Sequence, residues 1–384
     1  MTMKHWIAAL TLAIVSTASF TASASTENDR WESIEQQAKG QTVYFNAWGG
    51  NQEINAYLRW ASRELQRDYG VTLKHVKVTD IAETVNRLLA EKTAGKDSGG
   101  SVDMVWINGE NFKSMKENDL LYGPFVSTLP NWQIVDKSLP VEEDFTEPTD
   151  GLEAPWGVGQ LVFIHDQKTL ANPPRSFAEL LSLAKAFPGR ISYPKPPEFH
   201  GTSFLKAALL ELTDVREALY LPVDEVDFDT VTAPLSRYLD QLHQVAWREG
   251  AQFPSGSAET IQLLDDGELL VAIAFNPNAA KAAVASGKLA PSARAFAFDQ
   301  GALSNIHFMA IPYNANAKAG AMVAINFLMS EKAQLRKADT QVWGDPPVVK
   351  LFDTAEVSRF NTQPEPHPSW QTALESAWLK RYGQ

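Results

Sequence analysis

The stretch Thr42–Leu65, TVYFNAWGGNQEINAYLRWASREL, decides the fold that we expect for the rest of the chain. Its first residues, Thr42–Phe45, are β-branched, apolar and aromatic, which is typical of a buried strand. Gly49 and Gly50 interrupt this run, because glycines adopt backbone angles that other residues resist. Apolar residues at helical spacing then continue to Leu65. A strand, a glycine turn and a helix are the opening unit of an open α/β sheet.

In such a sheet, ligands bind beyond the carboxyl ends of the strands. The groups that this sequence places there are the ring of Trp48, the backbone amides of Gly49 and Gly50, and the side chains of Asn51 and Gln52. A helix N-terminus can also receive a negative group of a ligand. The alternative is a structural turn with a tryptophan in the core, and at this point both interpretations stay open.

Residues 1–24 have the pattern of a signal peptide. Lys4 precedes the apolar run Trp6–Val15, and Ala22–Ala24 supplies the small residues that signal peptidase requires. The apolar run is too short to cross a membrane as a helix. We therefore expect cleavage after Ala24 and a chain exported to the periplasm.

The composition excludes several classes of function. Acidic residues outnumber basic ones by 46 to 34, and the formal net charge of −12 argues against nucleic acid or an anionic membrane as a partner. The acidic surface fits a cationic ligand, but it also fits the ordinary solubility of an exported protein. The chain has no cysteine, so disulfides, cysteine nucleophiles and thiolate metal sites are excluded. With 384 residues, it is too long for one compact domain.

Strands and helices continue to alternate along the chain, which predicts βαβ crossovers. Val102–Ile107 is a nearly continuous apolar strand that ends in a polar loop at Asn108. Ala154–Asp166 combines Gly157 and Gly159 with an apolar strand. We expect the first crossing between two lobes here, because glycines can absorb the torsion changes of a hinge.

The remaining candidates for ligand binding lie at helix starts, at strand ends and in turns. Gly201 precedes Thr202 and Ser203, and either hydroxyl can cap a helix and leave backbone amides free at its start. The others are Trp156, Asn276, Asn305 and Trp343. The carboxylates of Glu142, Glu143, Asp144 and Glu147 are interpreted as a solvated loop and not as an acid/base pair.

The sequence contains no arrangement typical of an enzyme or a metal site. The histidines after the signal region are scattered, and none has metal-binding spacing. Ser182–Lys185 matches the S-x-x-K pattern of serine acyl enzymes, but the companion motifs are missing. Gly157 and Gly159 lack the third glycine of a dinucleotide loop. We therefore predict no catalytic residue, no metal and no cofactor.

Several stretches, spread over nearly the whole chain, carry a resemblance through their order. They are Val43–Asn51, Val102–Asn108, Pro174–Leu180 leading to Pro188–Ser192, Gly267–Ile273, and Met309–Pro312 with Ala324–Gln334. In this order they resemble the extracellular solute-binding proteins of bacterial ABC importers. The most similar group is the family 1-like one with thiamine-, polyamine- and ferric-iron-binding members, especially its YnjB-type branch.

The resemblance implies a two-lobe α/β fold of the type II periplasmic-binding-protein class. Each lobe would hold a mostly parallel sheet flanked by helices, with the ligand cleft at the hinge. The first lobe would comprise residues 25–157 and 296–345, and the second lobe residues 158–295, with 346–384 packing near it. The cleft residues that the resemblance implies are Trp48, Asn51, Asn108, Trp156, Gly201, Thr202, Asn276 and Asn305.

The function implied is capture of a small organic ligand by a monomer, which closes on the ligand and delivers it to a membrane permease. Aromatic rings, amides and an acidic background favour an organic cation such as thiamine or a polyamine, although a sugar fits nearly as well. Ferric iron is disfavoured, because the iron-binding members use adjacent tyrosines and this chain has no Tyr-Tyr pair. The alternatives are an exported enzyme on the same scaffold and a sensory subunit that presents a ligand to a receptor.

Overall fold

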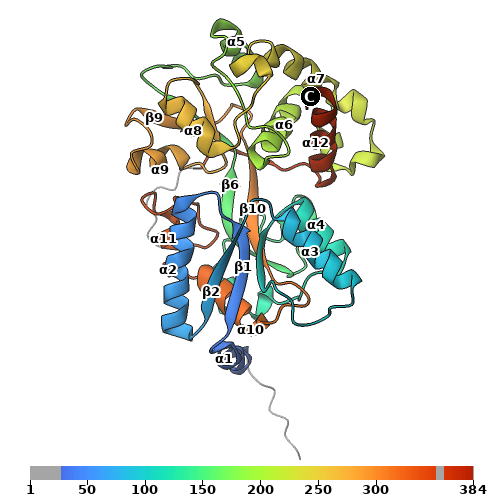
Figure 1. The fold of residues 1–384 in the computed structure, drawn as a ribbon, viewed down its shortest axis with the longest axis vertical. Coiled ribbons are helices and arrows are strands. Elements are labelled where there is room, and N and C mark those ends of the chain that lie inside the picture. Colours follow the sequence, from blue (N-terminus) through green and yellow to red (C-terminus); the bar gives the residue numbers. More distant parts are fainter. Residues whose placement is uncertain (1–26, 352–358, 384) are drawn as a thin grey trace, which may run out of the picture.

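The computed structural model describes residues 27–351 and 359–383, so the predicted signal peptide lies outside the described residues. The described chain forms two α/β lobes, one above the other in Figure 1, with β6 (Glu153–Gln160) and β10 (Ala302–Ala310) running between them. The first lobe, which holds the larger sheet, is the lower one, and the second lobe is the upper one. Among the described helices, none is long and apolar enough to cross a membrane.

The sheet of the first lobe is mixed. Its other strands are β1 (Thr42–Trp48), β2 (Thr72–Val78), β3 (Met104–Ile107) and β11 (Thr362–Pro364). Within the described residues the order is β11-β10-β3-β1-β2, and β6 pairs with β10 outside this path. β1 is parallel to β2 and β3, whereas β10 is antiparallel to β3 and β6. The carboxyl ends of β1, β2 and β3 therefore share one edge of the sheet.

Helices cover both faces of this sheet. They are α1 (Glu27–Ala38), α2 (Gln52–Tyr69), α3 (Ala82–Thr93), α4 (Glu110–Glu117), α10 (Lys318–Leu328) and α11 (Glu331–Ala338). Val43 and Phe45 of β1 pack in one apolar cluster with α2 and α10, whereas Val105 and Ile107 of β3 pack in another with α3 and α4. Two buried faces explain why these strands are apolar almost throughout.

The second lobe is built on a smaller sheet with β7 (Val162–Asp166) in its centre, between β8 (Ala272–Ala274) and β9 (Ala293–Phe296). Both neighbours are antiparallel to β7. The expectation of a mostly parallel sheet is therefore wrong for this lobe, because β7 enters from the first lobe in the direction opposite to both neighbours. The helices of this lobe are α5 (Phe177–Ala186), α6 (Phe199–Leu212), α7 (Phe228–His243), α8 (Ser257–Asp265), α9 (Ala279–Ala285) and α12 (Ser369–Tyr382).

The shorter elements lie in the connections. The hairpin of β4 (Glu143–Asp144) and β5 (Glu147–Pro148) belongs to the connection between α4 and β6. The short 3-10 helices are η1 (Val126–Thr128), η2 (Pro130–Ile134), η3 (Arg216–Tyr220), η4 (Val223–Glu225) and η5 (Trp247–Gly250).

The opening unit predicted from the sequence is confirmed in β1 and α2. Asn51 begins α2, because its Oδ1 accepts a hydrogen bond from the backbone N–H of Ile54 at 2.9 Å. Gly70 ends the helix with a φ of 68°, a conformation that favours glycine. Local sequence signals at both ends therefore fix the length of this helix.

The segment 346–384 divides between the lobes. Its helix α12 packs on α6 of the second lobe. Val348 and Val349, however, pack in the core of the first lobe, and β11 pairs with β10 in the sheet of that lobe. The chain thus passes between the two lobes from β6 to β7, from β9 to β10, and from β11 to α12.

Candidate functional site

The turn after β1 exposes one tryptophan ring, and the amide of Gly49 in this turn is bound by the neighbouring strand. Trp48 is 37% exposed, and its ring lies so close to Gly50 that a Cβ there would be 2.5 Å from it. The backbone N–H of Gly49 donates to the carbonyl of Val78 at 3.1 Å, so the expected free amide at Gly49 is wrong. Asn51 uses its side-chain oxygen to cap α2. Trp48 therefore presents an exposed aromatic ring at the carboxyl end of β1.

The loop between the end of β3 and the start of α4 is the second strand end that faces the other lobe. Asn108 is partly exposed there, and Gly109 adopts a φ of 59°. The N–H of Gly109 donates to Oδ2 of Asp144 at 2.6 Å, and a Cβ on Gly109 would lie 2.7 Å from the Phe145 ring. The β4–β5 hairpin thus packs directly on the start of α4. Asp144 is buried, so its interpretation as part of a solvated loop is wrong.

The start of α6 is capped by a residue that the sequence analysis did not consider. Oε2 of Glu198 accepts hydrogen bonds from the N–H groups of His200 at 2.8 Å and Gly201 at 3.2 Å. The prediction that Thr202 or Ser203 caps this helix is therefore wrong, and the amide of Gly201 is not free. Both residues belong to the first turns of α6, and their side chains are buried.

The two buried hydroxyls have separate partners. Thr202 donates through Oγ1 to Oε1 of Glu375 on α12 at 2.8 Å, which ties α6 to α12. Ser203 donates to the carbonyl of Phe199 at 2.8 Å. Thr202 thus links two helices of the second lobe, whereas Ser203 bonds within its own helix. The segment Glu198–His200 before them is partly exposed.

Carboxyl groups from both lobes and one lysine lie near the boundary between the lobes, in what we call the interlobe carboxylate cluster. Nζ of Lys206 on α6 lies 2.8 Å from Oε2 of Glu365, and both side chains are buried. The same Nζ lies 4.7 Å from the centroid of the Phe145 ring in the first lobe. Oε1 of Glu365 accepts from Nδ2 of Asn305 at 2.9 Å. The members of the cluster are Glu110, Asp144, Glu153, Lys206, Glu365 and Glu375.

The pKa values of this cluster are displaced upward. Loss of hydration raises the pKa of Glu110 to about 7, against the attraction of Lys206, and the negative charges of Glu375 and Glu365 add to the increase. Burial also raises the pKa of Asp144 well above its ordinary value, and that of Glu153 likewise, with the charge of Asp144 adding to it. The cluster holds more carboxyl groups than lysines, so protons stabilise this region.

A second contact joins the lobes on the side of α2. Oδ1 of Asn276 accepts from the N–H of Asn278 at 2.8 Å, and Nδ2 of Asn278 donates to the carbonyl of Gly344 at 2.9 Å. Lys288, which follows α9, forms an ion pair with Glu53 of α2 at 2.7 Å. Asn276 is partly exposed beside this contact.

Trp156 and Trp343 are placed in the core of the first lobe. Trp156 is fully buried, and its ring centroid lies 5.3 Å from that of Trp343, which is also buried. Neither ring has surface to offer a ligand in this structure. The sequence could not distinguish a core ring from a cleft ring, because both are apolar residues at a strand end or turn.

The glycines of β6 allow side chains to approach the strand closely. A Cβ on Gly157 would lie 1.9 Å from Oδ2 of Asp345 and 2.3 Å from Nε2 of His307, and these two side chains are 3.1 Å apart. Nζ of Lys337 also bonds Oδ2 of Asp345, so three buried polar side chains meet at this glycine. Burial alone would raise the pKa of Asp345, but Lys337 and His307 hold it below its ordinary value.

Gly159 has a similar role at the point where the strand leaves the first lobe. A Cβ on Gly159 would lie 2.6 Å from the ring of Phe275, which follows β8 in the second lobe. The sequence singled out both glycines as hinge residues. In the structure, neighbouring side chains pack so closely against both glycines that a larger residue would not fit at either position.

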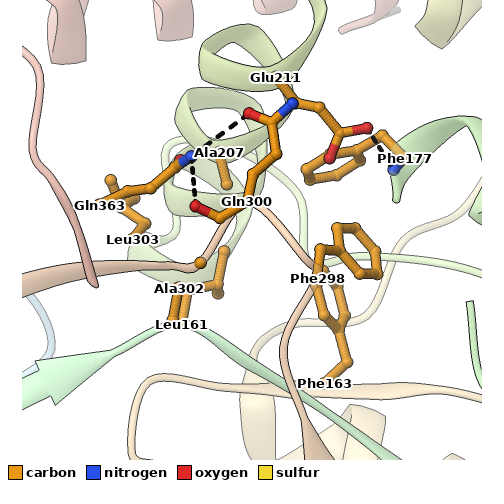
Figure 2. A pocket seen from close by; sticks show the side chains of 11 residues that line it. Leu161, Phe163, Phe177, Ala207, Glu211, Phe298, Gln300, Ala302, Leu303 and Gln363 are labelled. Atoms are coloured by element: carbon orange, nitrogen blue, oxygen red, sulfur yellow. Dashed lines mark hydrogen bonds between the residues drawn. The ribbon is translucent and has the colours of Figure 1, made fainter. Parts of the chain in front are cut away.

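A small cavity in the second lobe is too small for an organic ligand. It lies between β7, the start of α5, α6 and the segment Phe298–Leu303, as Figure 2 shows, and its volume is about 10 Å³. This is room for roughly one water molecule. Its polar groups are already paired, since Glu211 accepts from the N–H of Phe177 at 2.7 Å and Gln363 donates to the carbonyl of Gln300 at 2.9 Å. Within residues 27–351 and 359–383, no three His, Asp or Glu side chains form a group that could hold a metal.

Comparisons with known proteins identify relatives over nearly the whole chain. A family model described as "Bacterial extracellular solute-binding protein" matches residues 60–362. The Escherichia coli (strain K12) protein YnjB is 48% identical over 372 residues, which cover 94% of this chain and 96% of that protein.

Solved structures with low sequence identity share the fold. One is the periplasmic binding protein AfuA from Actinobacillus pleuropneumoniae, solved with fructose-6-phosphate, with a TM-score of 0.65 and 14% identity over 89% of this chain and 99% of that chain. Another is a periplasmic thiamin-binding protein, with a TM-score of 0.63 and 17% identity over 89% of this chain and 95% of that chain.

Proposed function

The chain belongs to the bacterial extracellular solute-binding proteins, and from this premise we propose that it captures a small organic solute between its lobes in the periplasm and delivers it to an ABC permease in the inner membrane. The observation that carries the proposal is the match to this family over nearly the whole two-lobe chain. The solute would stabilise the closed arrangement of the lobes, because it touches both of them.

The proposed ligand surface joins strand ends of the first lobe to loop ends of the second. Trp48 and Asn108 would contribute from the first lobe, and Asn276 and the segment before Gly201 from the second. Trp48 supports this proposal because its ring is more exposed than is usual for tryptophan. Trp156 and Trp343 would act only indirectly, by holding the first lobe rigid behind this surface.

The charge of the interlobe region favours an organic cation, such as thiamine or a polyamine, as the solute. Glu110 and Glu375 face the boundary from opposite lobes, and loss of hydration raises the pKa of both carboxyl groups. A bound cation would favour their ionised forms and gain their attraction. A phosphorylated sugar would meet repulsion there, whereas a neutral sugar would gain ring and amide contacts but no attraction between charges. The proteins solved with fructose-6-phosphate and named for thiamin share only the fold with this chain. The argument for a cation is therefore the set of carboxyl groups between the lobes.

An enzyme on this scaffold is the alternative, and one pair of residues makes it worth testing. Asp144 and Glu153 are adjacent carboxyl groups with raised pKa values, as in some acid/base pairs. Both side chains are buried, so a substrate could not reach them in this arrangement of the lobes. We therefore propose that the solute is released unchanged.

The test is a thermal-shift and calorimetric comparison of thiamine, spermidine, glucose and fructose 6-phosphate with the purified chain. We expect the cations to stabilise it, and we expect Trp48→Ala to weaken their binding by about tenfold or more. Tyr44→Ala is the matched control, because Tyr44 is an equally exposed ring on the same strand, away from its carboxyl end. Stabilisation by fructose 6-phosphate but not by the cations would contradict the cation assignment. Mass spectrometry that found the bound solute chemically altered would contradict the binding role.

A further inference from the structure

A groove on the first lobe lies between α2 and the end of α11, and nothing in the proposed solute binding uses it. Its volume is about 470 Å³. Trp60 and three arginines, Arg59, Arg63 and Arg336, line it. The three arginines are exposed, and the guanidinium of Arg336 lies 4.8 Å from the centroid of the Trp60 ring.

The positive charge of this groove is not compensated locally. Within the part of the chain that the structure describes, Arg59, Arg63 and Arg336 have no ion pair with a carboxylate. One turn further along α2 the opposite holds, because Arg67 forms ion pairs with Glu64 and Asp68. A chain with a net charge of −12 therefore concentrates free positive charge on one hollow of its surface.

The carboxylate that lines the same groove is already neutralised. Glu53 forms an ion pair with Lys288 of the second lobe at 2.7 Å. It therefore does not compensate the three arginines. The pair also joins one wall of the groove to the second lobe. A partner bound in the groove would therefore touch Glu53, whose ion pair with Lys288 depends on how the two lobes are arranged.

The spacing of the arginines fits an extended acidic chain. Arg59 and Arg63 are four residues apart on α2, which places them about 6 Å apart along the helix axis. Alternate side chains of an extended peptide repeat at about 6.6 Å, so two carboxylates of such a peptide match this pair. Arg336 lies across the groove on α11 and could bind a third. Guanidinium groups also bind carboxylates through two parallel hydrogen bonds.

We propose that the α2–α11 groove docks an acidic segment of a protein partner. The charge complementarity and the volume of the groove, which is several times larger than a single inorganic anion, support a peptide segment as the occupant. The proposal does not depend on which solute the chain carries. It adds a partner surface on the outside of the first lobe, next to the contact between the lobes.

The test uses a fluorescent peptide of four Glu-Ser repeats as the probe and fluorescence anisotropy as the measurement. We expect saturable binding at about 20 mM salt that weakens as salt increases, and no binding of the matching Gln-Ser peptide. Arg63→Gln should weaken binding about threefold or more, and the double variant Arg59→Gln/Arg63→Gln about tenfold. Each variant is first checked for an unchanged melting temperature and unchanged solute binding.

Arg67→Gln is the matched control, because it removes the same charge from the same exposed helix but outside the groove. It should change the affinity of the peptide by less than about twofold. Equal losses for Arg63→Gln and Arg67→Gln would show general attraction to the surface and would overturn the proposal. Displacement of the peptide by inorganic phosphate at equal molar concentration would also overturn it, because the groove would then be an ion site.

Discussion

Nζ of Lys206 on α6 and Oε2 of Glu365 beyond β11 are 2.8 Å apart, and both side chains are almost completely buried. The lysine belongs to the second lobe, whereas the glutamate follows a strand of the sheet in the first lobe. The pair therefore fastens the two lobes where the interlobe carboxylate cluster lies. A buried pair of this kind costs hydration, and its loss leaves one charge without a partner.

Lys206→Met should destabilise the chain by about 3–5 kcal/mol, because Glu365 would remain buried without its partner. Urea unfolding measures this change. Lys288→Met is the matched control, since it removes the exposed lysine that pairs with Glu53 and should cost less than about 1 kcal/mol. Similar losses for the two variants would contradict a special role for the buried pair.

Glu110→Gln should flatten the dependence of stability on pH. The pKa of Glu110 is about 7 in the folded chain and near 4.5 when unfolded, so between these values only the folded chain keeps the proton. Stability therefore falls as pH rises from about 4.5 to about 7, by up to about 3 kcal/mol from this group. The glutamine does not ionise, so the variant should be more stable than the wild type at pH 8 and similar to it at pH 4.

Thermal unfolding over this pH range provides the measurement for Glu110→Gln. Glu117→Gln is its control, because Glu117 is exposed on the same helix. Asp144 and Glu153 also have raised pKa values, so part of the pH dependence should remain in the variant. A pH profile that is unchanged by Glu110→Gln would refute the assignment.

Gly157→Ala should destabilise the first lobe by about 2–4 kcal/mol, because the new methyl group would overlap Asp345 and His307. Chemical unfolding would measure the loss. Gly256→Ala is the control, since the nearest atom to its Cβ would be 3.3 Å away and belongs to the end of the Glu198 side chain. If both alanines were tolerated equally, close packing would not be the reason for glycine at 157.

Asn51 offers a way to separate a structural role from a ligand contact. Asn51→Ala should cost about 1 kcal/mol, because the N–H of Ile54 would lose its acceptor, whereas Asn51→Ser should keep most of the cap. Solute affinity measured by calorimetry should then fall in both variants if the amide also contacts the solute. If Asn51→Ser bound the solute with the affinity of the wild type, the only role of Asn51 would be to cap α2.

Local patterns were sufficient to predict the opening unit and most strands of the first sheet, although not β11. The alternation of Val43, Phe45 and Ala47 and the helical spacing after Asn51 depend only on neighbours in the chain. The two-lobe α/β architecture was implied by the resemblance to the solute-binding family. The antiparallel arrangement around β7 could not be predicted, because strand direction in a small sheet is set by contacts distant in sequence.

The residues between the lobes were harder to predict for the same reason. Asp144 lies in a run of acidic residues that is typical of a solvated loop, and only its contact with Gly109 reveals its burial. Lys206 did carry a signal that was not used, since it interrupts the apolar helix Phe204–Leu210. A lysine in such a helix predicts a buried carboxylate partner, although the sequence does not say which one.

The position of β10 limits the order in which this chain can fold as it is synthesised. β10 pairs with β3 and β6, but it follows the complete sheet and most helices of the second lobe in the sequence. A nascent chain or a truncated product that stops before Ala302 would present β3 and β6 without that partner. Such fragments should aggregate more readily than the complete chain, which makes late mutations that end translation early more damaging than the size of the missing segment suggests.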